Sequence, residues 1–71
     1  MNKYGIVIFW SDHDNGYIAV VPDLPGCNAF GDTQEAAAHE IQDAMTAWIE
    51  ACKASGELIP EPSELPIRYA A

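Results

Sequence analysis

The chain has 71 residues, of which 49% are hydrophobic, and 11 acidic against 3 basic residues give it a net charge of −8. This length allows one small domain, which we expect to span residues 1–71, and the hydrophobic content argues against disorder. So few lysine and arginine residues argue against phosphate binding, and we expect no direct nucleic-acid binding by this chain alone. The charge suits a basic protein partner, although a net negative charge can also serve solubility alone.

Two apolar segments near the start predict a β-hairpin. Tyr4–Trp10 and Tyr17–Val21 are both rich in β-branched and aromatic residues, which is typical of strands. The polar segment Ser11–Gly16 lies between them, and Asn15 and Gly16 are the expected turn residues.

The first strand is apolar on both of its faces. Because side chains alternate along a strand, Ile6 and Ile8 lie on one face, and Val7 and Phe9 lie on the other. A single helix covers one face of a sheet, so the other face needs a second chain or a partner. We therefore expect self-association through the sheet, with a dimer as the commonest closed assembly.

Residues 21–35 read V-P-D-L-P-G-C-N-A-F-G-D-T-Q-E and redirect the chain twice. Pro22 and Pro25 donate no backbone hydrogen bond, so they end the second strand. Pro25 and Gly26 fit the central positions of a type II turn, in which glycine takes the positive φ. A short third strand, Cys27–Phe30, follows and ends at Gly31.

A long helix is predicted over Gln34–Ser55. Asp32 or Thr33 caps its start, with Glu35 three residues after Asp32 as in a capping box, and Gly56 ends it. Apolar residues recur at spacings of three and four and form one stripe that packs on the sheet. The residues of this stripe are Ala37, Ile41, Ala44, Met45, Trp48, Ile49 and Cys52.

Beyond the helix, Glu57–Glu64 is expected to be extended because Pro60 and Pro62 restrict it. Leu65–Ala70 predicts a fourth strand, which Pro66 confines to an edge of the sheet. The order ββ-β-α-β predicts an α+β fold, a two-layer sandwich of a three- to four-stranded, mainly antiparallel sheet and one long helix.

The sequence predicts a cytoplasmic protein. It shows no signal peptide before the first strand, and no apolar run approaches the about 18 residues of a membrane span. The two cysteines, Cys27 and Cys52, are then expected to be free thiols.

Several features together resemble the HicB family of antitoxins. A tyrosine and an isoleucine open the first strand, the run V-P-D-L-P-G-C-x-A-x-G-D-T follows, and a long helix with a tryptophan near its end leads to I-P-E-P. The resemblance covers Lys3 to about Pro62. Its signature positions are Pro22, Leu24, Pro25, Gly26, Cys27, Gly31, Thr33 and Trp48.

The resemblance implies a prokaryotic antitoxin with a partial RNase H-like fold, which neutralises a HicA-type toxin. Such a toxin is a small, basic mRNA interferase. The family also forms tetramers, and many members carry a C-terminal domain that binds operator DNA. The present sequence stops before such a domain, so we expect no separate DNA-binding domain.

Clusters of potential metal ligands are weak candidates for a site. Asp12, His13 and Asp14 crowd the hairpin loop, but adjacent loop residues rarely converge on one ion. His39 and Asp43 lie one helical turn apart, where a surface hydrogen bond is more usual than zinc. We therefore expect neither a metal nor a cofactor.

The RNase H resemblance raises a metal-dependent nuclease remnant as an alternative. The first strand, where a catalytic Asp would be expected, contains no acidic residue, and no nucleophile motif or phosphate-binding loop occurs. Cys27 is expected to be a small buried turn residue and not a reactive thiol. We therefore expect no enzymatic activity. An orphan oligomeric protein without a toxin is a further alternative, which the neighbouring coding sequence would test.

The favoured hypothesis is an antitoxin that covers a basic toxin with an acidic surface. The candidate toxin-binding residues lie in the hairpin loop, in the signature turn and at the start of the helix. They are Asp12, Asp14, Asp23, Asp32 and Glu35.

Overall fold

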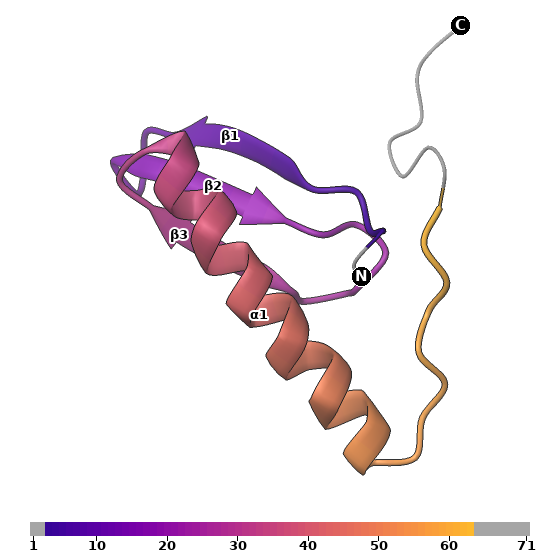
Figure 1. Cartoon of the computed structure of the whole chain (residues 1–71). Helices are drawn as coiled ribbons and strands as arrows, with labels where there is room; N and C mark the ends of the chain where they lie inside the picture. The colour runs from indigo at the N-terminus through magenta and orange to yellow at the C-terminus, as the bar shows by residue number, and fades with distance from the viewer. Residues whose placement is uncertain (1–2, 64–71) are drawn as a thin grey trace, which may run out of the picture.

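The computed structural model describes residues 3–63 and shows two layers, a sheet and a helix (Figure 1). Strands β1 (Val7–Ser11), β2 (Gly16–Val20) and β3 (Asn28–Gly31) form an antiparallel sheet in the order β1-β2-β3. Helix α1 (Gln34–Ala54) crosses one face of this sheet. The predicted α+β fold is confirmed. The predicted fourth strand, Leu65–Ala70, lies outside the described residues.

Each strand is shifted from its predicted bounds because its pairing partner decides where it begins. The sequence predicted the first strand from Tyr4, but β1 begins at Val7, whose partner is Val20, the last residue of β2. The chain turns away at Val21, so the ladder cannot extend further in that direction. Tyr4 still packs against the core, although it precedes the strand.

The predicted hairpin turn was wrong by one residue. The turn runs from Asp12 to Asn15, where the Asn15 N–H donates to the Asp12 carbonyl at 3.3 Å and Asn15 has a φ of 54°. Gly16 is instead the first residue of β2 and pairs with Ser11. A Cβ at this position would lie 2.4 Å from the Phe30 ring, so the ring packs where a larger residue would carry its side chain.

The signature turn has the predicted conformation. The Leu24 N–H donates to the Val21 carbonyl and the Cys27 N–H donates to the Leu24 carbonyl, each at 3.0 Å. Two β-turns therefore follow each other, with Pro22 and Pro25 at their second positions. Gly26 has a φ of 82°, as the type II turn requires.

Both ends of α1 are capped by local hydrogen bonds. The Thr33 hydroxyl accepts from the Ala36 N–H at 3.0 Å, so Thr33 is the N-cap and the capping box proposed for Asp32 was wrong. At the other end, the Gly56 N–H donates to the Lys53 carbonyl and the next N–H donates to Cys52, each at 3.1 Å. With Gly56 at a φ of 74°, this is a Schellman motif.

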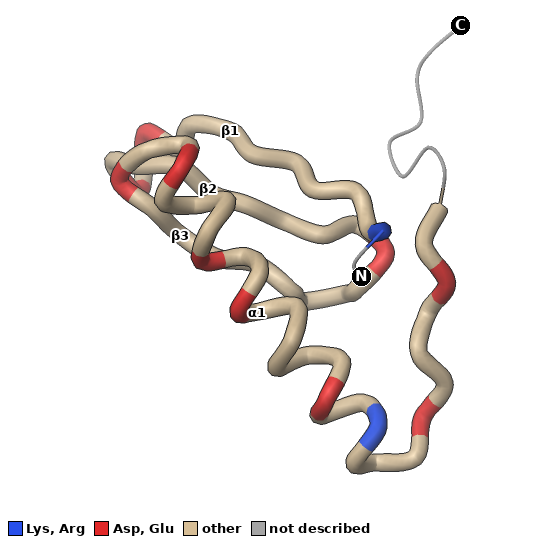
Figure 2. Tube along the Cα trace, viewed as in Figure 1, with Lys and Arg blue, Asp and Glu red and all other residues tan. Residues whose placement is uncertain are grey.

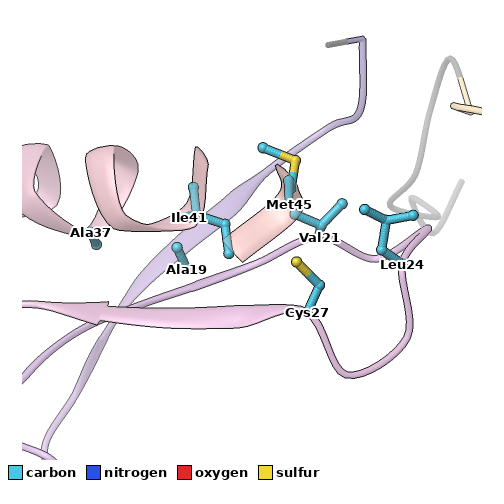
Figure 3. Packing of buried hydrophobic residues seen from close by; sticks show 7 residues of the cluster. All are labelled: Ala19, Val21, Leu24, Cys27, Ala37, Ile41 and Met45. Carbon is cyan, nitrogen blue, oxygen red and sulfur yellow. The ribbon is translucent and has the colours of Figure 1, made fainter. Parts of the chain in front are cut away.

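The core lies between the sheet and the predicted apolar stripe of α1, which is confirmed except for Cys52. Cys52 is buried, but its thiol contacts the Glu57 and Leu58 carbonyls and it does not belong to this core. Figure 3 shows seven of its buried residues, Ala19, Val21, Leu24, Cys27, Ala37, Ile41 and Met45. Gly31 allows the close approach of the two layers, because a Cβ there would lie 2.2 Å from the Ala37 backbone nitrogen. The Trp48 indole N–H donates to the Pro25 carbonyl at 2.9 Å, so the helix is also tied to the signature turn.

Residues 57–63 form an extended arm that runs back from the end of α1 without regular secondary structure (Figure 1). Two residues of this arm, Pro60 and Ser63, form hydrogen bonds with segments far away in the sequence. The Tyr4 hydroxyl donates to the Pro60 carbonyl, and Ser63 donates to the Asp23 carboxylate. Within residues 3–63, no helix has the length and apolar character that crossing a membrane requires.

Candidate interaction surfaces

The register of the sheet brings four of the five predicted toxin-binding residues to one end of the molecule. Ser11 pairs with Gly16 and Tyr17 pairs with Gly31, so the β1–β2 loop lies beside the β3–α1 connection. Acidic segments gather at this end in Figure 2. We call this surface the acidic end, and it consists of Asp12, Asp14, Asp32 and Glu35, all of which are exposed.

Two of these carboxylates are oriented by neighbouring side chains. The Trp10 indole N–H donates to Asp12 Oδ1 at 2.6 Å, and the Ser11 hydroxyl donates to Asp14 Oδ2 at 3.0 Å. The Trp10 ring also contacts the Tyr17 ring edge to face, with centroids 5.2 Å apart. The loop therefore packs beside two aromatic rings, Trp10 and Tyr17, while its carboxylates stay exposed to solvent.

The other half of the acidic end surrounds a shallow open hollow of about 460 Å³. Tyr17 and residues 32–35 at the start of α1 line it. Glu35 lies in the first helical turn, where the helix dipole favours negative charge. The dipole only partly offsets the carboxylates, because its charge is about half a unit. A hollow with this lining suits a cationic side chain better than an anion.

The structure places Asp23 apart from the other four. It lies in the signature turn at the opposite end of the sheet, where its carboxylate accepts hydrogen bonds from the Ser63 N–H at 2.9 Å and the Ser63 hydroxyl at 2.8 Å. Asp23 therefore fastens the extended arm, and its two carboxylate oxygens already have partners within the chain.

A second surface, which the sequence only partly indicated, is the face of the sheet turned away from α1. Alternation and register place five apolar side chains on it, and we call them the outer face: Val7, Phe9, Ile18, Val20 and Phe30. Phe9 is 46% exposed and Phe30 is 43% exposed. The first strand alone revealed Val7 and Phe9. Ile18, Val20 and Phe30 could be assigned to this face only from the pairing between the strands.

The remaining candidates for chemistry do not assemble into a site. Among residues 3–63, no three His, Cys, Asp or Glu side chains lie close enough together to hold a metal ion. His13, His39 and Asp43 are exposed. Cys27 is buried as predicted, and desolvation by burial raises the pKa of its thiol, which disfavours the nucleophilic thiolate.

Comparisons with known proteins give one matching family and two relatives. Residues 4–70 match the family described as HicB_like antitoxin of bacterial toxin-antitoxin system. The chain is 41% identical over 58 residues to the UPF0150 protein Ta0767 of Thermoplasma acidophilum, which covers 82% of this chain and 83% of that protein. It is 36% identical over 55 residues to the UPF0150 protein ssr1765 of Synechocystis, which covers 78% and 70% respectively.

Proposed function

This chain belongs to the HicB-like antitoxin family of bacterial toxin–antitoxin systems, and we propose that it binds and neutralises a HicA-type mRNA interferase by direct protein–protein contact. The observation that carries this proposal is the acidic end, where register and helix start bring Asp12, Asp14, Asp32 and Glu35 together. A toxin that binds RNA presents basic side chains to phosphates. The carboxylates of the acidic end would occupy the place of those phosphates.

The proposed role is one of binding and needs no catalytic group. It places the protein in the cytoplasm, in agreement with the free thiols of Cys27 and Cys52. The chain would act as a homo-oligomer, a dimer or a tetramer, and would not bind nucleic acid by itself. A mobility-shift assay at low salt tests the last point stringently, because weak phosphate contacts are strongest there. A specific band without a partner protein would contradict it.

Electrostatic steering predicts how binding should depend on salt. The net charge of −8 attracts a basic partner from a distance. The Debye length shortens from about 30 Å at 0.01 M to about 8 Å at 0.15 M salt, so association should slow as salt rises. Dissociation should change less, because it depends mainly on short-range contacts.

The experiment is stopped-flow association with a HicA-type toxin. The test variant carries Asp12→Lys and Asp14→Lys, and the matched control carries Glu57→Lys and Glu61→Lys on the exposed arm. Both variants change the net charge from −8 to −4, since each replaces two acidic residues with two lysines. The proposal predicts a larger fall in association rate for the test variant than for the control. Equal rates in the two variants, or a flat salt dependence in the unmodified protein, would refute it.

A further inference from the structure

The outer face is an apolar surface that the described chain leaves partly uncovered. Helix α1 packs on the opposite face, where Ala19 is fully buried, and Phe9 and Phe30 stay nearly half exposed. Two cross-strand rows build this surface, Val7–Val20–Asn28 and Phe9–Ile18–Phe30. Ile18 lies at its centre, on the middle strand and between two aromatic rings.

The outer face is preformed in the single chain. Gly16 has no side chain, and the Phe30 ring lies where a Cβ at that position would be, at 2.4 Å from it. Gly16 is buried, so part of the Phe30 ring covers the neighbouring strand while 43% of Phe30 stays exposed. An apolar surface held by backbone register loses little conformational freedom when another surface packs on it.

Charge decides which occupant fits. Within the two rows and the adjoining pair Ser11–Gly16, no side chain is ionisable. A basic partner finds its complement at the acidic end and not on this uncharged surface. Two copies of this chain, each at −8, repel each other wherever their acidic surfaces approach. An uncharged apolar face is the place where two copies can meet without bringing like charges together.

We propose that two copies of this chain pack sheet against sheet through the outer face. The contact is isologous, so each copy supplies the same side chains, with Ile18 close to the two-fold axis. This inference specifies the oligomer of the proposed function and does not depend on the identity of the toxin. The acidic end lies at the ends of the strands, outside the stacked faces, so both copies keep it accessible. Repulsion favours the arrangement in which the two acidic ends lie far apart.

The size of the outer face predicts a weak dimer. Three strands about 4.8 Å apart and about four residues long, at about 3.4 Å per residue, give a patch of roughly 14 Å by 14 Å. That is about 200 Å² in plan, well below the about 800 Å² per partner of a standard stable interface. We therefore expect monomer and dimer to exchange within the micromolar concentration range.

Sedimentation equilibrium between low micromolar and near-millimolar concentration tests this proposal. The test variant combines Phe9→Thr and Ile18→Thr, which remove apolar surface and place threonine, a residue that favours strands, at both positions. Trp10→Thr is the matched control, because Trp10 adjoins Phe9, is 48% exposed against 46%, and lies on the helix side of the sheet. We expect at least about a tenfold rise in the dimer dissociation constant for the test variant. We expect little change for the control.

The proposal is overturned if the unmodified chain stays monomeric throughout this range, or if Trp10→Thr weakens the dimer as much as the test variant does. An unchanged dimer in the test variant would place the contact on a strand edge instead. Far-UV circular dichroism checks that each variant folds. If the double variant does not fold, the single variant Val20→Thr replaces it. A weaker dimer in this variant would likewise support the proposal.

Salt separates this proposal from toxin binding. Raising salt should strengthen the dimer, because screening reduces the repulsion between two acidic chains. The same change should slow association with a basic toxin. The variant with Asp12→Lys and Asp14→Lys should keep its dimer while it loses toxin association rate. Loss of the dimer in this hairpin-loop variant would contradict the outer-face contact and would leave the antitoxin proposal standing.

Discussion

Gly31→Ala tests the closest approach between the sheet and the helix. A Cβ at this position would lie 2.2 Å from the Ala37 nitrogen and 2.7 Å from the Ala36 carbonyl carbon. These are backbone atoms at the start of α1, so no side-chain rotation can relieve the contact. Favourable separations are about 3.5–4.0 Å, so β3 and the first turn of α1 must move apart by more than about 1 Å.

That movement loosens the packing of Ala37 and Ile41, which are both fully buried against the sheet. Overpacking a core costs about 1–3 kcal/mol, and the rigid backbone obstacle places Gly31→Ala at or above the upper end. At about 0.05–0.15 kcal/mol per residue, a domain of this length has an unfolding free energy of only about 4–10 kcal/mol. We therefore expect Gly31→Ala to lower the free energy of unfolding by about 3 kcal/mol or more, which is a large share of the total.

Urea unfolding followed by far-UV circular dichroism measures this loss. Gly56→Ala is the matched control, because Gly56 has a φ of 74° and open space around its Cβ position, so only backbone strain arises. That strain should cost about 1–2 kcal/mol. If Gly31→Ala loses no more free energy of unfolding than Gly56→Ala, the proposed backbone clash does not limit the packing of the two layers.

Three further predictions concern the contacts around this core, and urea unfolding measures each. Trp48→Phe should lower the free energy of unfolding by about 1 kcal/mol, because it removes the hydrogen bond to Pro25. Trp48→Ala should lower it by about 3–5 kcal/mol, because the whole ring is lost. Equal losses in the two variants would refute a separate role for the ring. Thr33→Ala should cost about 1 kcal/mol by removing the N-cap, whereas Thr33→Ser should be nearly neutral. Burial raises the pKa of the Cys27 thiol, so the folded state keeps a proton that the unfolded chain releases. The thiol should therefore leave the free energy of unfolding unchanged below the ordinary thiol pKa of about 8.5 and should lower it as the pH rises above that value. Cys27→Ala should remove this contribution to the loss of stability at high pH.

The sequence by itself determined the elements whose physics is local. The prolines fix φ and lack an N–H, so Pro22 and Pro25 ended β2 in both prediction and structure. Gly26 and Gly56 take the positive φ that a type II turn and a helix end require. The helix followed from apolar residues at spacings of three and four, a period that only a helix places on one face. Family membership followed from the same turn residues.

Tertiary structure decided what depends on distant residues. Gly16 looked like a turn residue, but its glycine makes room for the Phe30 ring, which comes from another strand. Both Asp32 and Thr33 can cap a helix, and Thr33 does so in the fold, where Gly31 brings β3 against the start of α1. The ends of the strands were misplaced because a ladder extends only as far as its partner does.

The two candidate surfaces divide in the same way. The acidic residues were visible in the sequence, but only the register shows that four of them share one end and that Asp23 binds Ser63 at the other. Alternation indicated Val7 and Phe9, but the alignment of β2 and β3 was needed to place Ile18 between the two phenylalanines. Turns and helical periodicity arise from neighbours along the chain, whereas a surface is formed by residues that pairing and packing bring together.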